Sequence, residues 1–386
     1  MRVSAIYVQY YKISMEKKIF KKLFIEIGVV FLLTSLTLSL IIWILQAVNF
    51  LDIISEDGHS IATYFKYSLL NLPKIISKIL LLSFFLSLFY VLVSYDEKNQ
   101  LLIYWSNGIS KNKFLSKIFF FSFIFIFFSF FLSFVVVPFT QDKARSFIRS
   151  SSLDFFPALI KPKQFIDTVE NLTIFINKKE NDRIENLILK DSSNINNIQL
   201  IIAKEGKIVN ENNNKFLFLY DGKIINSSSE KKSTVFNFNE TRFNLDKYKT
   251  KTTTTPKIQE LNSFEIIDCL INVNKNTKLK YNNFECNENL LKELSQELYK
   301  RMYLPFYIPL ISIIVSFLIL NSHNHFNYKK TKSITFLIGI FFIILSQVSV
   351  NFISEKIYFN YLILLILPIA TIFSIYLFNI KTKFSS

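Results

Sequence analysis

Several long stretches of this chain contain no Asp, Glu, Lys or Arg and consist mainly of Phe, Leu and Ile. A segment that crosses the hydrocarbon of a bilayer as a single helix pairs its own backbone N–H and C=O groups, because lipid offers them no hydrogen-bond partners, and such a helix needs about 20 mostly apolar residues. Half of the residues are hydrophobic, and 43 are Phe, which is more apolar material than one soluble core contains. We therefore predict membrane spans within residues 27–51, 118–141, 302–327, 333–354 and 357–380.

A sixth apolar stretch, residues 79–95, is short for a span. It can be extended backwards through Pro73, Lys74 and Lys78, because Pro is tolerated near the start of a helix and Lys can extend its ammonium group to an interface. The sequence thus predicts six spans.

The basic residues of the short loops predict the orientation, because Lys and Arg concentrate on the cytoplasmic side. In a six-span arrangement they fall on one side, which holds Arg2, Lys12, Lys17, Lys18, Lys21, Lys22, Lys98, Lys111, Lys113, Lys117, Lys329, Lys330, Lys332, Lys381 and Lys383. We expect both termini in the cytoplasm. The first apolar stretch is too long for a signal peptide, and Met15 is an alternative start position. Because the charge lies in these loops, the net charge of +16 does not indicate a nucleic-acid partner.

Between the third and fourth spans the pattern changes to short alternating segments, which indicate strands. They lie at residues 164–169, 172–176, 199–203, 216–220 and 234–238, with expected turns at residues 170–171, 206, 212–214 and 221–222. The predicted fold is an α-helical membrane protein of six transmembrane helices, arranged three and three around an all-β periplasmic domain, a sandwich or jelly roll. The expected parts are residues 1–141, 142–286 and 287–386, and a helix is expected over residues 287–301.

The residues that carry most enzyme chemistry are missing or dispersed. With only six glycines the chain forms neither a P-loop nor a dinucleotide-binding loop, and its histidines have no carboxylate or cysteine at a spacing typical of a metal or nucleophile site. We expect no enzyme, no cofactor and no metal. Cys269 and Cys286 would lie outside the cytoplasm, where disulfides persist. A bridge between them is slightly favoured over two buried free thiols.

Residues 96–113 form the most informative loop, because a cytoplasmic loop here carries the apolar run 101–105. We expect a short amphipathic helix that ends at Gly108 in a left-handed conformation, with Ser110 as the N-cap of the next helix. Its apolar residues would dock into a cytoplasmic protein, or the helix would lie on the lipid surface. The sequence leaves both interpretations open.

This order of elements resembles the paired lipopolysaccharide-export permeases LptF and LptG. The segment 99–110 (NQLLIYWSNGIS) is similar to the coupling helix of that family, residues 49–52 (NFLD) to the end of its first span, and residues 297–305 (ELYKRMYLP) to the start of its fourth. The family usually has Glu where this chain has Gln100. Span one carries no lysine at residues 27–51, which favours LptF over LptG.

The resemblance implies a non-catalytic subunit of an ABC transporter that extracts lipopolysaccharide from the bacterial inner membrane and passes it towards the outer membrane. It implies as partners a second, LptG-like permease, a dimer of an LptB-like ATPase, an LptC-like single-span subunit and an LptA-like periplasmic bridge. The residues expected to contact the ATPase are Asp96, Glu97, Gln100, Leu101, Tyr104, Trp105 and Gly108. Lys74 and Lys78 are the candidates for binding the phosphates of the transported lipid. Alternatively, their side chains only extend to the headgroups of the surrounding bilayer. An LptG-type subunit or a membrane scaffold without transport activity remains an alternative function.

Overall fold

The computed structural model describes residues 2–51, 61–151, 162–169, 171–180, 183–194, 197–211, 214–228, 233–245, 257–273, 280–281, 284–286, 290–321, 325–353 and 357–384. Two compact units make up the chain. One combines Met1–Trp43, Leu72–Thr140 and Lys257–Ser386, and the other combines Ile44–Asn71 with Gln141–Pro256.

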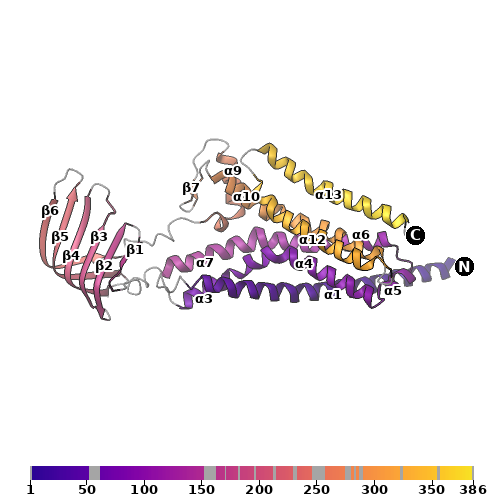
Figure 1. Ribbon diagram of the computed structural model, residues 1–386, viewed down its shortest axis with the longest axis horizontal. Helices are drawn as coiled ribbons and strands as arrows, with labels where there is room; N and C mark the ends of the chain where they lie inside the picture. The colour runs from indigo at the N-terminus through magenta and orange to yellow at the C-terminus, as the bar shows by residue number, and fades with distance from the viewer. Residues whose placement is uncertain are drawn as a thin grey trace. The chain divides into compact units, whose positions relative to one another are not determined.

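The helices account for most of the first unit (Figure 1). In chain order, the helices are α1 (Arg2–Asn49), α3 (Ile61–Leu70), α4 (Leu72–Glu97), α5 (Leu101–Ser106), α6 (Lys111–Phe131), the π-helix η1 (Leu132–Val136), α7 (Val137–Ser151), η2 (Ile258–Glu260), α9 (Ser263–Val273), α10 (Leu291–Met302), η4 (Leu304–Phe306), α11 (Tyr307–Ser316), η5 (Phe317–Leu320), α12 (Tyr328–Asn351) and α13 (Ile357–Phe384). The helix expected over residues 287–301 corresponds to α10.

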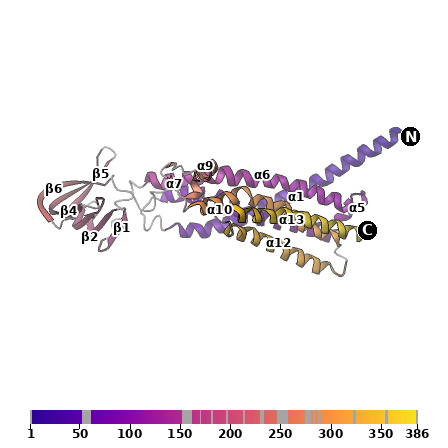
Figure 2. The same ribbon diagram turned by 90° about the horizontal axis from the view of Figure 1, so that it is seen from above.

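Within the described part of the chain, six helical stretches are long and apolar enough to cross a membrane: Met15–Asn49, Ile61–Glu97, Lys111–Ile148, Leu291–Leu320, Tyr328–Asn351 and Ile363–Lys383. Three precede the strands and three follow them, which confirms the predicted arrangement. The second extends back through Lys78 and Lys74 as expected, because α4 begins at Leu72 with Pro73 in its first turn. The N- and C-termini lie at the same end of the helices (Figures 1 and 2).

Helix α11 is at the centre of the helical unit. All of its residues are buried, and it packs against α4, α6, α12 and α13. An α-helix that is apolar on every side is expected in such a central position. The neighbouring α4 and α12 also meet closely, since a Cβ atom added at Gly339 of α12 would overlap the ring of Phe85. The core therefore depends on a glycine at that contact.

The strands form an antiparallel β-sheet domain between the two groups of spans in the sequence, as predicted. Among the described residues, one antiparallel sheet contains β1 (Phe165–Val169), β2 (Leu172–Glu180), β3 (Arg183–Asp191), β4 (Asn197–Glu211), β5 (Asn214–Ser228) and β6 (Ser233–Asn244), each paired with the next. This consecutive order is a meander, whereas a jelly roll has Greek-key connections between two facing sheets. A short separate pair, β7 (Lys280–Tyr281) and β8 (Phe284–Glu285), precedes α10.

The expected turns at Gly206 and at Asp221-Gly222 are wrong, because these residues lie inside β4 and β5. The alternation of buried residues slips by one place there: Ile201 and Ala203 are buried before the slip, and Ile208 after it. Next to this slip, Asp221 of β5 has a φ of 49°, which is typical of a bulge that bends a strand. The turn-like residues thus mark a bend across the sheet, and apolar residues from both sides of it share one core.

Candidate functional site

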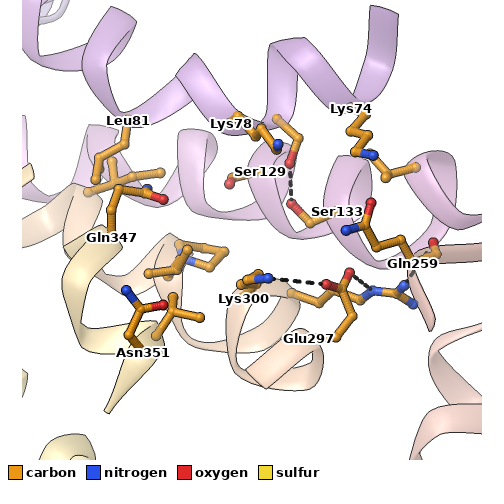
Figure 3. Close-up of a pocket in the computed structure, with 17 residues that line it drawn as sticks. Lys74, Lys78, Leu81, Ser129, Ser133, Gln259, Glu297, Lys300, Gln347 and Asn351 are labelled. Carbon is orange, nitrogen blue, oxygen red and sulfur yellow. Dashed lines mark hydrogen bonds and ion pairs between the residues drawn. The ribbon is translucent and has the colours of Figure 1, made fainter. Parts of the chain in front are cut away.

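A cavity of about 360 Å³ lies within the helical unit, between α4, the α6–η1–α7 stretch, α10 with η4 and α11, and α12 (Figure 3). Its lining residues are Lys74, Ser77, Lys78, Leu81, Ser129, Ser133, Val137, Gln259, Glu297, Lys300, Arg301, Leu304, Pro305, Ile308, Gln347, Val350 and Asn351. The cavity therefore combines charged, amide, hydroxyl and apolar side chains from elements that are far apart in the sequence.

The cavity carries more positive than negative charge. Lys74 and Lys78 are four residues apart on α4, so they share one face of the helix. Lys300 and Arg301 of α10 line the same cavity, and Glu297 is its only carboxylate among the described residues. In Figure 3 the two α4 lysines project from one side of the cavity, and Glu297 and Lys300 lie on the other. An excess of basic groups in membrane spans is costly unless it serves a ligand or a partner.

Arg301 is almost completely buried, with 2% of its side chain exposed. Its Nε donates to Oε1 of Glu297 at 3.1 Å, and Nη1 donates to the carbonyl oxygen of Leu261 at 2.9 Å and to Oγ of Ser263 at 3.0 Å. Nη2 donates to the carbonyl oxygen of Gln259 at 3.1 Å. The planar guanidinium thus joins η2 and the start of α9 to α10. Sequence reasoning noted Arg301 within a motif but missed this role.

A second polar contact crosses the cavity wall where the helix geometry is irregular. The hydroxyl oxygens of Ser77 and Ser133 are 2.8 Å apart, and Ser133 belongs to the π-helix η1. Such π-helical turns often occur at functional sites. With its ammonium, amide and hydroxyl groups, this wall can bind an anionic group that carries hydroxyls, such as a phosphorylated sugar. No cluster of His, Cys, Asp and Glu suited to a metal occurs among the described residues.

The segment around α5, residues 96–113, has the predicted local structure. Gly108 has a φ of 72°, which is the left-handed conformation, and Oγ of Ser110 accepts a hydrogen bond from the backbone N–H of Lys113 at 3.3 Å. The predictions of a glycine stop and a serine N-cap are confirmed. The six residues of α5 therefore form a short helix between spans two and three.

The apolar residues of α5 divide between the inside and the surface. Tyr104 is 1% exposed, packs against Phe20 and Phe114, and its hydroxyl donates to the carbonyl oxygen of Ile19. Burial, with a smaller effect from the negative charge of Glu26, raises the pKa of Tyr104, so the phenol stays protonated. Leu101 is also buried and Trp105 is half-buried. The residues that face outward are Leu102 (56% exposed) and Ile103 (51%), which the sequence analysis did not single out.

The acidic residues before α5 also differ in their surroundings. Asp96 is buried, whereas the exposed Glu97 accepts a hydrogen bond from Nζ of Lys332 at 2.9 Å, at the start of α12. Gln100 is half-buried and its side chain forms no cap for α5. Glu97 therefore has a partner within this chain.

The two cysteines lie close to the residues that bind Arg301. A disulfide joins Cys269 of α9 to Cys286, which precedes α10, with a Cα–Cα distance of 5.9 Å. Both belong to a small buried cluster with Leu261, Ile266 and Leu294. Arg301 thus connects the start of α9 to α10, and the disulfide connects α9 to Cys286, ahead of α10 in the chain.

The sequence model of the family described as "Lipopolysaccharide export system permease LptF/LptG" matches residues 22–381. The chain belongs to this family. The match covers all six helical stretches that can span a membrane, at least in part, and the strands between them. The permeases of the LptF/LptG family are non-catalytic transmembrane subunits, in agreement with the prediction of no enzyme.

A curated relative of this LptF/LptG-family chain is the protein named "Uncharacterized protein RP871" from Rickettsia prowazekii (strain Madrid E). It is 21% identical over 192 residues, which cover 49% of this chain and 53% of the relative. The chain thus spans about half the length of this relative.

Proposed function

We propose that this chain is a permease subunit of an ABC transporter that extracts lipopolysaccharide from the inner membrane and passes it to a periplasmic bridge. The observation that carries the proposal is the basic cavity among apolar spans in a member of the LptF/LptG family. A lipopolysaccharide combines phosphorylated sugars with several acyl chains. The cavity has ammonium and amide groups for the sugars, and Leu81, Pro305 and Ile308 provide an apolar wall.

Within this proposal, Lys74 and Lys78 bind lipid phosphates. They lie on one helical face, and Lys300 and the amides of Gln347 and Asn351 line the same space. Glu297 forms ion pairs with Arg301 and Lys300. Its negative charge therefore offsets the charges of Lys74 and Lys78 less than that of an unpaired carboxylate would. A phosphate carries negative charge and several acceptor oxygens, which suits two ammonium groups one turn apart.

The segment around α5 would dock onto the dimer of an LptB-like ATPase through Leu102 and Ile103. Exposed apolar residues on a short loop helix fit a groove in a cytoplasmic partner. Tyr104 and Leu101 would support the docking face from behind, because they are buried in the chain. We infer that both termini and this loop are cytoplasmic, supported by the basic residues of these segments.

We propose the remaining partners from membership of the family. This subunit would be of the LptF type, since residues 27–51 of span one carry no lysine. It would then pair with a second permease of the LptG type. An LptC-like single-span subunit and an LptA-like bridge would receive the lipid on the periplasmic side, where the β domain is proposed to lie.

Lipid co-purification tests the role of the cavity. The full complex carrying Lys74→Gln and Lys78→Gln should retain at least about a hundredfold less lipopolysaccharide by mass spectrometry, because each of the two lost charged hydrogen bonds contributes about 1.5–3 kcal/mol and about 1.4 kcal/mol is tenfold in affinity. Lys66→Gln is the matched control, since Lys66 is an exposed lysine of α3 outside the cavity. Equal lipid retention in both variants would remove the lysines from the site, and absence of lipid from the unmodified complex would favour a scaffold.

Partner association tests the docking face. The double change Leu102→Ser and Ile103→Ser should abolish co-purification of the ATPase, because exposed apolar anchors at such contacts often contribute about 2 kcal/mol or more. Ser106→Ala is the control, since Ser106 is also exposed on α5. Unchanged ATPase association in the double variant would assign α5 to the lipid surface instead.

A further inference from the structure

Helix α9 has apolar residues on two faces, and the described residues of the chain bury only one of them. Ile266 and Cys269 are buried in the cluster against α10. On the opposite side Phe264 is 71% exposed and Ile271 is 48% exposed. Residues 264 and 271 are two turns apart, so they lie on one face of the helix. An apolar stripe thus follows the outer side of α9.

The outer side of α9 is itself amphipathic. At about 100° per residue, Ile267 lies on one flank of the Phe264–Ile271 stripe, whereas Asp268, Asn272 and Glu265 follow one another on the other flank. The surface is thus divided lengthwise into an apolar sector and an acidic, polar sector. Helices that lie in a membrane interface have this division, with one sector in lipid and the other in water.

The position of α9 along the spans places its apolar sector at the edge of the hydrocarbon. Oγ of Ser263 donates to the carbonyl oxygen of Phe134 at 2.7 Å, and the rings of Phe264 and Phe134 are in edge contact with centroids 5.4 Å apart. The charge-free stretch of span three begins after Lys117, and Phe134 lies about 26 Å further along the helix at about 1.5 Å per residue. Since the hydrocarbon is about 30 Å thick, Phe134 lies within about one helical turn of its boundary, on the side opposite Lys111.

The apolar sector also continues an exposed apolar surface of span three. Phe131 and Val135 of span three are exposed beside Phe134, and the ring of Phe130 is stacked on that of Phe134 with centroids 5.1 Å apart. Exposed Phe and Val side chains on a membrane span face lipid or another span. The ring of Phe264 extends this aromatic surface onto α9.

Two contacts hold α9 in this orientation. The guanidinium of Arg301 binds the oxygens of Leu261 and Ser263 at the start of the helix, and the disulfide holds its middle at Cys269. Both fix the face opposite to Phe264. In Figures 1 and 2 α9 lies beside α10, at the end of the helical unit remote from the C-terminus.

We propose that α9 is an interfacial helix whose Phe264, Ile267 and Ile271 sector inserts into the lipid leaflet at the end of span three opposite Lys111. Insertion of α9 would fix the depth of the cavity in the membrane. Arg301 lines the cavity and binds Ser263 of α9, and Lys300 is the next residue on α10, so the inserted helix holds these basic groups at the level of lipid headgroups. The inference does not depend on the transported lipid.

Tryptophan quenching in proteoliposomes tests this insertion on the full chain. The two native tryptophans, Trp43 and Trp105, are replaced by Phe, and Phe264→Trp is compared with Asn272→Trp on the polar sector. The probe is phosphatidylcholine brominated near the top of the acyl chain, with acrylamide as the aqueous quencher. We expect a blue-shifted emission and strong quenching by bromine for the tryptophan at 264. At 272 we expect red-shifted emission and quenching by acrylamide.

Two outcomes would overturn the proposal. If acrylamide quenches both tryptophans alike and bromine neither, the sector faces water. If the tryptophan at 264 is protected from both quenchers, another protein surface covers it. Formation of the Cys269–Cys286 disulfide, checked by alkylation before and after reduction, establishes that each variant has folded around α9.

Discussion

The Nε of Arg301 donates to Oε1 of Glu297 at 3.1 Å, one helical turn earlier on α10, while its other nitrogens bind three oxygens of η2 and α9. A buried arginine that donates to four oxygens of three elements cannot be replaced by another side chain without loss. Lysine has one nitrogen and lacks the planar fork. The cavity wall and the attachment of α9 therefore depend on this one residue.

Arg301→Ala should be strongly destabilising. Removing one partner of a buried ion pair costs about 3–5 kcal/mol, because the other partner stays buried and unpaired. Thermal unfolding in detergent, followed by size-exclusion chromatography, measures the change. Lys300→Ala is the matched control, since Lys300 is 44% exposed and surface changes usually stay within about 0.5 kcal/mol. Equal melting temperatures for the two variants would contradict the role given to Arg301.

Gly339→Ala should destabilise the contact between α4 and α12. The added methyl group would overlap the ring of Phe85, which is fully buried, so the ring must shift against its packed neighbours. Overpacking of this kind costs about 1–3 kcal/mol. A double-mutant cycle with Phe85→Leu measures the coupling. The double variant should be more stable than the sum of the two single changes predicts, and strict additivity would argue against this contact.

Loss of the disulfide should lower stability without removing any buried charge. The bridge joins residues 17 apart, and closing a loop of about this size contributes about 3 kcal/mol. Cys269→Ser with Cys286→Ser should lower the melting temperature, and so should reduction of the unmodified protein. Maleimide labelling of both cysteines without prior reduction would show that the bridge does not form.

Tyr104 should affect stability rather than partner choice. Tyr104→Phe loses one hydrogen bond to Ile19 and should cost about 1 kcal/mol, whereas Tyr104→Ala opens a cavity and should cost about 3–5 kcal/mol. Because the phenol stays protonated, its contribution should not vary between pH 6 and pH 9. If Tyr104→Phe abolishes ATPase binding at unchanged melting temperature, the hydroxyl contacts the partner directly.

The orientation predicts the outcome of reporter fusions. Fusions at Gly58, Lys207 and Lys356 should report the periplasm, and fusions at Asn107, Asn327 and Phe384 the cytoplasm, because the basic loops stay inside. Paired alkaline phosphatase and fluorescent-protein reporters give opposite signals at each site. A cytoplasmic signal at Lys207 would overturn the periplasmic assignment of the β domain.

The six spans, the inserted strands and the caps at Gly108 and Ser110 could be read from the sequence, because each depends on local composition. A span needs one apolar stretch, a strand one alternating segment, and a cap one or two residues. The same local reasoning failed at Gly206 and Asp221-Gly222. Turn-forming residues also suit a bulge inside a long strand, and only pairing with neighbouring strands distinguishes the two.

The sequence by itself determined which segments cross the membrane and that the second span extends back through Lys78 and Lys74. Only the tertiary structure decided that Lys300 and Arg301, more than 200 positions later in the sequence, line the same cavity. It also turned Tyr104 inward and left Leu102 and Ile103 on the surface. The reason is that helix and strand formation follow from neighbours in the chain, whereas the face that each helix buries depends on which distant helices it packs against.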